Sequence, residues 1–423
     1  MQLDEMVPGC EDAPADPRAA AQSSPWSIDI GHDRLPPVSR LPGQLTVLDV
    51  TKWFGNTSGG VRTYLEQKSA YVASRPWLRH VLVIPSDRDV IEDRPMARWY
   101  RLRGPRIPSQ PQYRFLLAAR SLRRIVEHER PDVIEVGSPV FVPWIATLAA
   151  RGTRIPIVSF YHTNLLTRSR SARWPGRLHD NLLRAYARRI DRLFATTLVA
   201  SGAAESDLWS AGLHRTTRVT LGVDIAMFNP SRRTTASMIR AMHGVREGRR
   251  MIVYAGRLAR EKSLEIAVEA FRDPRLQSRA DLVIVGDGPL GLELRERARG
   301  LPIHFAPFES NRRRLADLLA ASDVYLAPGS RETFGLSSLE AMACGTPVVT
   351  ADAGGVAELV SRAGVGRLFR SGDAESLAKQ LNAVLDESSE TMAIATRDFV
   401  EREHSWEVAF DRLFDAYRSV LAA

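Results

Sequence analysis

Short apolar runs rich in β-branched residues alternate with segments of helical periodicity, and this alternation occurs in both halves of the chain. The runs are continuously apolar, which predicts strands buried on both faces, as in parallel sheets covered by helices. Repetition of the pattern predicts an α/β protein with two doubly wound parallel-sheet domains. The predicted strands are 45–50, 80–84, 132–136, 155–160 and 193–199 in the first half and 251–254, 281–285, 303–305, 323–326 and 347–350 in the second.

The length of 423 residues exceeds what one hydrophobic core normally supports, so two domains are expected. We expect the first α/β domain at 43–225, a linker at 226–248 and the second α/β domain at 249–402. Apolar residues at helical spacing between Trp406 and Leu421 predict a terminal helix within 403–423. Such a helix needs an apolar surface to cover, and we expect it to cross back onto the first domain.

Residues 1–42 are rich in Pro, Ala, Ser and acidic residues and lack the basic and apolar segments of a signal peptide. A disordered tail is the expected structure for this composition. The most apolar stretch, 136–150, contains two prolines and is too short to span a bilayer. Two cysteines, Cys10 and Cys344, cannot form a disulfide framework or a thiolate zinc site, which favours a reducing cytoplasm.

The positive charge of the chain is confined to one region. The formal net charge is +9, but residues 43–225 carry 28 basic and 15 acidic residues, whereas the basic and acidic residues of 226–423 balance. Such asymmetry predicts an anionic partner for the first domain. The pI of about 9.9 alone is typical of nucleic-acid-binding proteins. The neutral second half and the absence of any known nucleic-acid-binding motif argue against that class.

Two glycine-containing segments follow predicted strands and can approach an anionic ligand. Gly59 and Gly60 lie between the first strand and a helical pattern, where a helix N-terminus favours an anion. In the second half, Gly256 is followed by Arg257 and Lys262 on one loop, and these two cations can converge on a diphosphate. Each segment is equally compatible with a plain strand–helix turn or a solvated loop.

A third segment, Gly286-Asp287-Gly288-Pro289, forms a tight turn at the carboxyl end of the strand 281–285. Open α/β sheets place their ligands at this end. A turn that serves only the fold is at least as consistent with Asp287.

The most specific segment follows the strand 323–326 and contains Glu332 and Glu340 on either side of a helix start. A rigid helix holds the two carboxylates apart, so they can serve two ends of one ligand. Gly335 and Leu336 offer backbone N–H groups at the helix N-terminus, and Gly345 ends the helix. Glu340 lies on an otherwise apolar face, where a carboxylate is costly unless it is paired or faces a ligand.

Together these segments resemble the retaining glycosyltransferases of family 4, over about residues 45–421 and most sharply over 250–360. The resemblance implies the GT-B fold, in which two Rossmann-like domains face each other across a cleft. It also implies transfer of a hexose from a nucleoside diphosphate sugar with retention of anomeric configuration. A departure from the family pattern is Leu221, which stands where Asn is frequent before Gly-Val-Asp.

The resemblance implies a role for each matching residue. Gly59 and Gly60 would lie against the donor diphosphate, which Arg257 and Lys262 would neutralise. Glu340 would bind the ribose hydroxyls, and Glu332 would contact the sugar. His162 matches the family's cleft histidine. Further donor-binding positions are Gly286 and Asp287, together with Phe334, Gly335 and Leu336 around the sugar and phosphates. The sequence contains no metal-ligand cluster, so no metal or other cofactor is expected.

Two arginine-rich clusters in the first domain bear on the acceptor. One surrounds Arg98-Trp99-Tyr100-Arg101, and the other accompanies a helical apolar pattern at 178–190. A basic amphipathic helix is typical of proteins that lie on anionic lipid, and a solvated helix explains the pattern equally well. We expect a lipid or lipid-linked acceptor at the cytoplasmic face of the membrane. The expected acceptor or membrane face comprises Arg168, Arg170, Arg173, Trp174, Arg177, Arg184 and Arg188.

Other functional classes remain open at this stage. A soluble sugar or polysaccharide acceptor is one alternative, and a non-catalytic nucleotide-sugar-binding protein is another. A dinucleotide oxidoreductase is disfavoured because no Gly-x-Gly-x-x-Gly follows a first strand. The sequence leaves open the base, the sugar, the acceptor linkage and the oligomeric state.

Overall fold

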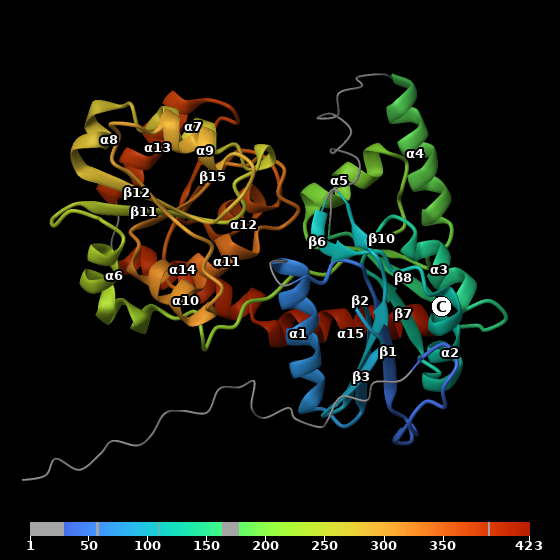
Figure 1. Ribbon diagram of the computed structural model, residues 1–423. Helices are drawn as coiled ribbons and strands as arrows, with labels where there is room; N and C mark the ends of the chain where they lie inside the picture. Colours follow the sequence, from blue (N-terminus) through green and yellow to red (C-terminus); the bar gives the residue numbers. More distant parts are fainter. Residues whose placement is uncertain (1–28, 56–58, 109, 163–176, 388–389) are drawn as a thin grey trace, which may run out of the picture.

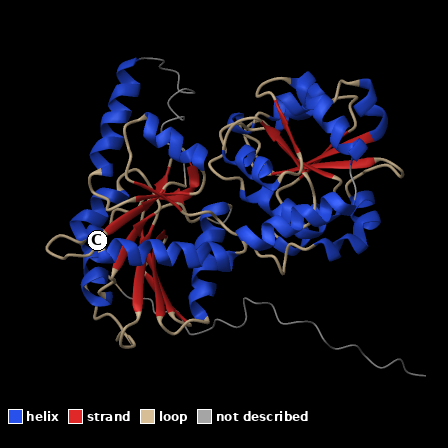
Figure 2. Ribbon diagram, turned by 180° about the vertical axis from the view of Figure 1, so that it is seen from behind, coloured by secondary structure: helices blue, strands red, loops and turns tan. Residues whose placement is uncertain are grey.

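The computed structural model describes residues 29–55, 59–108, 110–162, 177–387 and 390–423. The chain forms two lobes, each with a twisted sheet flanked by helices on both faces (Figures 1 and 2). This arrangement confirms the predicted fold class. In the described residues, no helix combines the length and apolarity needed to cross a membrane.

The first sheet has eight strands in the order β10-β9-β8-β7-β1-β2-β4-β3, and only β3 runs antiparallel to its neighbour. A separate two-stranded sheet, β5-β6, lies beside it, with β6 in contact with β2. The strands are β1 (Leu45–Val50), β2 (Leu78–Ser86), β3 (Val90–Arg94), β4 (Ala97–Arg103), β5 (Arg106–Ile107), β6 (Gln110–Arg114), β7 (Val133–Val136), β8 (Ile157–Phe160), β9 (Thr197–Val199) and β10 (Thr216–Arg218). The helices are α1 (Gly60–Ala73), α2 (Ala119–Glu129), α3 (Val142–Ala149), α4 (Arg177–Asp191) and α5 (Gly202–Ser210).

The second sheet has six parallel strands in the order β13-β12-β11-β14-β15-β16. The order of strands reverses between β11 and β14, and doubly wound sheets bind ligands outside the carboxyl ends of the strands at such a point. The strands are β11 (Arg250–Ala255), β12 (Ala280–Val285), β13 (Ile303–Ala306), β14 (Val324–Ala327), β15 (Val348–Ala351) and β16 (Arg367–Phe369). The helices are α6 (Ala236–Met242), α7 (Leu264–Ala270), α8 (Pro274–Arg279), α9 (Gly291–Arg297), α10 (Arg312–Ala321), α11 (Leu336–Ala343), α12 (Gly355–Ala363), α13 (Ala374–Glu387), α14 (Glu390–His404) and α15 (Trp406–Ala422).

All ten predicted strands are present in the described residues. The sequence did not predict the short strands β5, β6, β10 and β16 or the charged strands β3 and β4. The cluster Arg98-Trp99-Tyr100-Arg101 is part of β4, with Trp99 and Tyr100 buried. The buried Arg98 guanidinium pairs with Asp93 and Glu129. Much of this cluster's positive charge is therefore neutralised inside the domain.

Two segment boundaries differ from the sequence-based expectation. Residues 29–42 are ordered, because Ile30 is fully buried against the first domain and Arg40 pairs with Asp132 at 2.5 Å. Residues 1–28 lie outside the described part of the chain. The expected linker contains a short 3-10 helix, Pro230–Thr235, and α6, both of which pack against α10. This segment is an integral layer of the second domain.

The terminal helix α15 leaves the second lobe and lies against α1 of the first (Figure 1). A buried polar cluster joins the two helices. The Lys68 ammonium on α1 donates to the Tyr417 hydroxyl on α15 at 2.6 Å and lies 2.8 Å from the Asp49 carboxylate. Glu135 on β7 accepts hydrogen bonds from Tyr64 and Tyr417, and burial followed by the nearby Asp49 raises its pKa to about 7.

Replacing Lys68 tests how much this buried polar cluster stabilises the contact between α1 and α15. We expect Lys68→Met to lower the free energy of unfolding by about 3–5 kcal/mol, because two buried carboxyl groups lose their counter-charge. The deficit should be smaller at pH 6 than at pH 8, since Glu135 can bind a proton in the folded variant. Urea unfolding followed by tryptophan fluorescence measures the free energy of unfolding of the variant and of the unaltered protein at both pH values. Lys379→Met, at an exposed position, is the matched control, and an equal effect in the two variants would contradict the expectation.

Candidate active site

A cleft of about 1050 Å³ is lined by residues of both domains. Its walls include residues that directly follow strands of the two sheets: Tyr161 and His162 after β8, Ala200 after β9, and Gly256 after β11. The carboxyl ends of strands from both domains therefore meet at one cavity, as expected for ligand sites of doubly wound sheets.

Two helix N-termini approach each other in this cleft. Gly59 and Gly60 start α1, and Gly335 and Leu336 start α11. A Cβ built on Gly60 would lie 3.9 Å from the Leu336 side chain. The backbone N–H groups of the first turns and the positive ends of the two helix dipoles make the space between them favourable for an anion.

Gly335 has a structural reason to be glycine. Its φ is +90°, and a Cβ at this position would come within 2.2 Å of the Val356 side chain. Any other residue would move the start of α11, which carries Glu340 and whose N-terminal amides face the cleft.

Lys262 and Glu332 form an ion pair in the wall of the cleft, and each side chain is about one quarter exposed. Lys262 ends a short 3-10 helix after β11, and Glu332 lies on the loop between β14 and α11. They come from the two strands that flank the topological switch point. A cation and a carboxylate are thus placed together where a ligand's phosphate and hydroxyl groups could engage them.

Glu340 is buried on α11, with its carboxylate 2.8 Å from the Arg312 guanidinium at the start of α10. Burial raises the pKa of Glu340, and the charge and hydrogen bond of Arg312 oppose this rise. Sequence reasoning missed Arg312. Its position at the start of the helix that follows the predicted strand 303–305 was the available signal.

His162 lies in an aromatic pocket at the first-domain side of the cleft. Its ring stacks on Phe160 with centroids 4.2 Å apart, and the Tyr64 ring lies 5.1 Å away. Burial lowers the pKa of His162 to about 4, partly opposed by Glu135 and reinforced by Lys68. The imidazole is therefore neutral at pH 7 and can donate one hydrogen bond and accept another.

Three expected donor-binding residues do not line the cleft. Arg257 is more than half exposed and pairs with Glu261. Gly286 packs against the Gly256 carbonyl oxygen, which would lie only 1.9 Å from a Cβ. The Asp287 carboxylate accepts a hydrogen bond from the Phe308 N–H at 3.1 Å. Gly286 and Asp287 thus hold neighbouring loops in place around the cleft. The other expected donor residues, together with His162, line it: Gly59, Gly60, Lys262, Glu332, Phe334, Gly335, Leu336 and Glu340.

The expected acceptor face is described only in part. Arg168, Arg170, Arg173 and Trp174 lie outside the described residues, as does the side chain of Arg177. Arg184 and Arg188 are exposed on α4 together with Leu182, whereas Ala187 and Ile190 are buried. The described part of α4 is therefore amphipathic, with an exposed leucine among its arginines.

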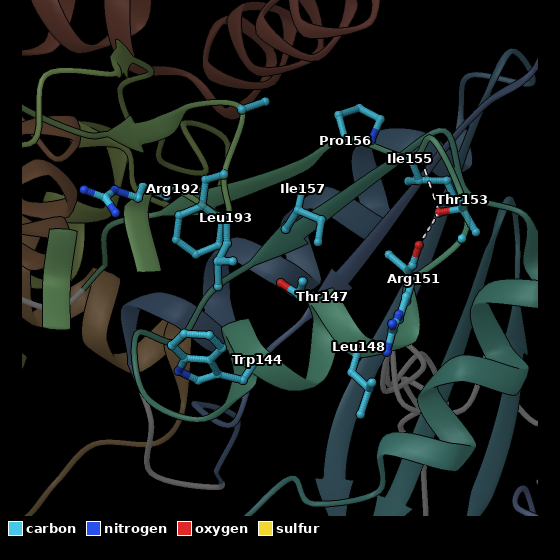
Figure 3. A pocket seen from close by; sticks show the side chains of 14 residues that line it. Trp144, Thr147, Leu148, Arg151, Thr153, Ile155, Pro156, Ile157, Arg192 and Leu193 are labelled. Atoms are coloured by element: carbon cyan, nitrogen blue, oxygen red, sulfur yellow. Dashed lines mark hydrogen bonds between the residues drawn. The ribbon is translucent and has the colours of Figure 1, made fainter. Parts of the chain in front are cut away.

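A second cavity, of about 670 Å³, lies within the first domain (Figure 3). Trp144, Ile157 and Leu193 point into it, and Arg192 points away from it. It lies beside the segments that precede β8 and β9, at the opposite end of these strands from His162. None of the motif residues lines this cavity. No group of three or more His, Cys, Asp or Glu that could hold a metal ion occurs among the described residues.

Comparison with known proteins places both halves of the chain in families. Residues 58–226 match the model of Glycosyltransferase Family 4, and residues 237–399 match that of Glycosyl transferases group 1. The chain is 32% identical over 325 residues to a GDP-mannose-dependent alpha-(1-6)-phosphatidylinositol dimannoside mannosyltransferase of Mycobacterium tuberculosis, covering 75% of this chain and 82% of the relative. It is 30% identical over 354 residues to a GDP-mannose-dependent alpha-mannosyltransferase of the same species, covering 80% and 88%.

Solved structures share the architecture. Sucrose-phosphate synthase from Thermosynechococcus elongatus has a TM-score of 0.71 at 22% identity, covering 90% of this chain and 100% of that chain. The Anabaena protein HepE in complex with UDP and glucose has a TM-score of 0.68 at 19% identity, covering 89% and 100%. Two Rossmann-like domains that meet at an interdomain cleft define a GT-B glycosyltransferase. The chain belongs to glycosyltransferase family 4, and it is a hexosyltransferase.

The environment of His162 predicts its titration. We expect the imidazole to titrate near pH 4 rather than at its ordinary value of 6.5. Because the unfolded chain binds this proton more readily, the residue's contribution to stability should be lost as the pH falls from 6.5 towards 4. Proton NMR of the imidazole C2–H, assigned by its absence in His162→Gln, measures the midpoint. A midpoint near 6.5 would contradict the burial argument.

Proposed function

We propose that this hexosyltransferase moves a mannosyl group from GDP-mannose to a lipid or lipid-linked acceptor, with retention of anomeric configuration. The observation that carries the proposal is the single cleft that gathers two helix N-termini, Lys262, Glu332 and Glu340. The GDP-mannose-dependent mannosyltransferases to which the chain is similar support the choice of donor and acceptor class.

The donor would bind with its diphosphate between the N-termini of α1 and α11. The amides around Gly60 and Leu336 and the Lys262 ammonium would stabilise the charge that gathers on the departing diphosphate. Glu332, held by Lys262, would contact the sugar, and Glu340 would bind the ribose hydroxyls. Lys262 would supply the positive charge that a metal ion otherwise provides at a diphosphate, so the reaction would need no metal ion.

The acceptor hydroxyl would approach from the first-domain side, where neutral His162 faces the cleft. The departing phosphate would take up the proton of the acceptor hydroxyl, so no side chain has to act as a general base. His162 would then orient a hydroxyl group by hydrogen bonding rather than carry a charge.

Lys262 and Glu332 give the sharpest test of the donor site. We expect Lys262→Ala to lower the transfer rate by about 10²–10³-fold or more, because the diphosphate charge loses its cation, and Glu332→Ala to abolish most transfer. Radiolabelled mannose incorporation with EDTA present measures both, and circular dichroism checks folding. Lys379→Ala is the control, and full activity in either cleft variant would refute the site assignment.

The location of the acceptor is tested separately by membrane binding. The first domain carries the excess positive charge, and α4 exposes Arg184 and Arg188 beside Leu182. We propose that this face lies peripherally on the cytoplasmic surface of an anionic membrane.

We expect the protein to float with liposomes containing phosphatidylinositol at low salt and not with phosphatidylcholine alone. Replacing Arg184 and Arg188 by serine should weaken flotation several-fold, because each basic residue near an anionic surface contributes about 1 kcal/mol. Serine at the exposed Arg313 and Arg314 of the second domain removes the same charge as a control. Absence of binding by the unaltered protein would favour a soluble acceptor.

A further inference from the structure

The cleft has a second-domain wall that none of the sequence motifs explains. It is formed by the loop between β13 and α10 and by the start of α10. Phe308, Glu309 and Ser310 lie on this wall, beside Arg312, whose guanidinium holds Glu340. In the proposed donor pose Glu340 binds the ribose and Lys262 the diphosphate. The nucleotide base, attached to the far side of the ribose, would then meet this wall.

Glu309 differs from the other carboxylates of the cleft. Each of these has a basic partner: Glu66 with Arg62, Glu92 with Arg101, Asp93 with Arg98, Glu332 with Lys262 and Glu340 with Arg312. Within the described residues, Glu309 forms no ion pair with a lysine or arginine. His243 lies close enough to feel its charge, but burial lowers the pKa of that histidine, so it is neutral at pH 7.

The orientation of the Glu309 carboxylate is fixed by the backbone. Its Oε1 accepts a hydrogen bond from the Asn311 N–H at 2.7 Å, which also precedes the start of α10. The second oxygen, Oε2, keeps its acceptor capacity for another donor. A carboxylate oxygen without a cation can accept hydrogen bonds from a ligand that brings N–H groups.

Phe308 supplies a second feature of the same wall. Its side chain is 44% exposed and lines the cleft, so its ring is accessible to a ligand that enters there. Bases are commonly held by stacking on an aromatic ring while hydrogen bonds read their Watson–Crick edge. An exposed ring next to an unpaired carboxylate provides both kinds of contact.

We propose that Glu309 selects guanine as the base of the donor and that Phe308 is the surface on which the base stacks. Guanine presents two adjacent donors, N1–H and the N2 amino group, and an ionised carboxylate accepts from both. Uracil presents N3–H between two carbonyl oxygens, which the same carboxylate repels. Adenine and cytosine each place a ring-nitrogen acceptor beside their one amino group. Glu309 therefore acts through attraction to guanine and through repulsion of the other bases.

This inference rests on the proposed function, because it places the base relative to Glu340. Its test uses nucleotide binding alone, so that it does not depend on the acceptor. Isothermal titration calorimetry with GDP and with UDP gives the ratio of the two dissociation constants. We expect the unaltered protein to bind GDP at least ~10-fold more tightly than UDP, as sites built around hydrogen bonds discriminate strongly.

Glu309→Gln is the informative variant. The amide oxygen can keep the bond from the Asn311 N–H, which places an N–H₂ donor where Oε2 accepts in the native chain. This donor opposes the donors of guanine and matches a carbonyl of uracil. We expect GDP binding to weaken by ~10-fold or more and UDP binding to be equal or tighter, so that the preference is lost. Glu247→Gln, at an exposed position outside the cleft, removes the same charge as a control and should leave the ratio unchanged.

Phe308→Ala separates stacking from base selection. Because every base has an aromatic face, this change should weaken GDP and UDP binding by similar factors and leave their ratio unchanged. A ratio that stays the same in Glu309→Gln would overturn the inference and leave the proposed function standing. A native preference for UDP would overturn the inference together with the choice of GDP-mannose as donor. Failure of the native protein to bind either nucleotide would overturn the proposed function and the inference together.

Discussion

The geometry of the cleft depends on how the terminal helix α15 is held against α1. Lys68, Tyr417, Asp49 and Glu135 are buried together at this contact, far from solvent that could replace any of their bonds. Since α1 also begins at Gly60, the same contact sets the position of the amides that face the second domain. At its other end, α15 follows α14, which packs on α11. The consecutive helices α14 and α15 thus connect the two helices whose N-termini line the cleft, because α14 packs on α11 and α15 packs on α1.

Charge in the cleft is arranged by pairing. Lys262 and Glu332 hold each other, and Arg312 keeps a cation beside buried Glu340. Such pairs fix the side chains before a ligand arrives, which reduces the reorganisation that binding and reaction require. His162 contributes no charge, because its aromatic surroundings favour the neutral ring. In the first domain, Arg98 and Arg101 likewise pair with carboxylates of the neighbouring strand β3.

The strands were predictable where their apolar residues are contiguous, because burial on both faces leaves a local signal in the sequence. Strand β4 was missed since its arginines find partners on β3 and α2, which the sequence does not place nearby. Residues 29–42 lacked a periodic pattern, yet Ile30 fills a space in the first core. The motif glycines and Glu332 were predictable because loops that follow parallel strands lie at the edge of the sheet where ligands bind. Arg257 was predicted for the cleft on the same ground, but Glu261, four residues away, pairs with it at the surface.

The sequence alone determined the class of the fold, the family and a set of motif residues, most of which line the cleft, because these depend on local patterns and on short motifs. Only the tertiary structure decided which charges are paired there. Glu340 and Arg312 are 28 residues apart, and Lys262 and Glu332 are separated by 70, so their pairing arises from the order of strands in the sheet. Only the tertiary structure could show that Glu309 forms no ion pair with a lysine or arginine of the described residues, because folding decides which side chains surround it.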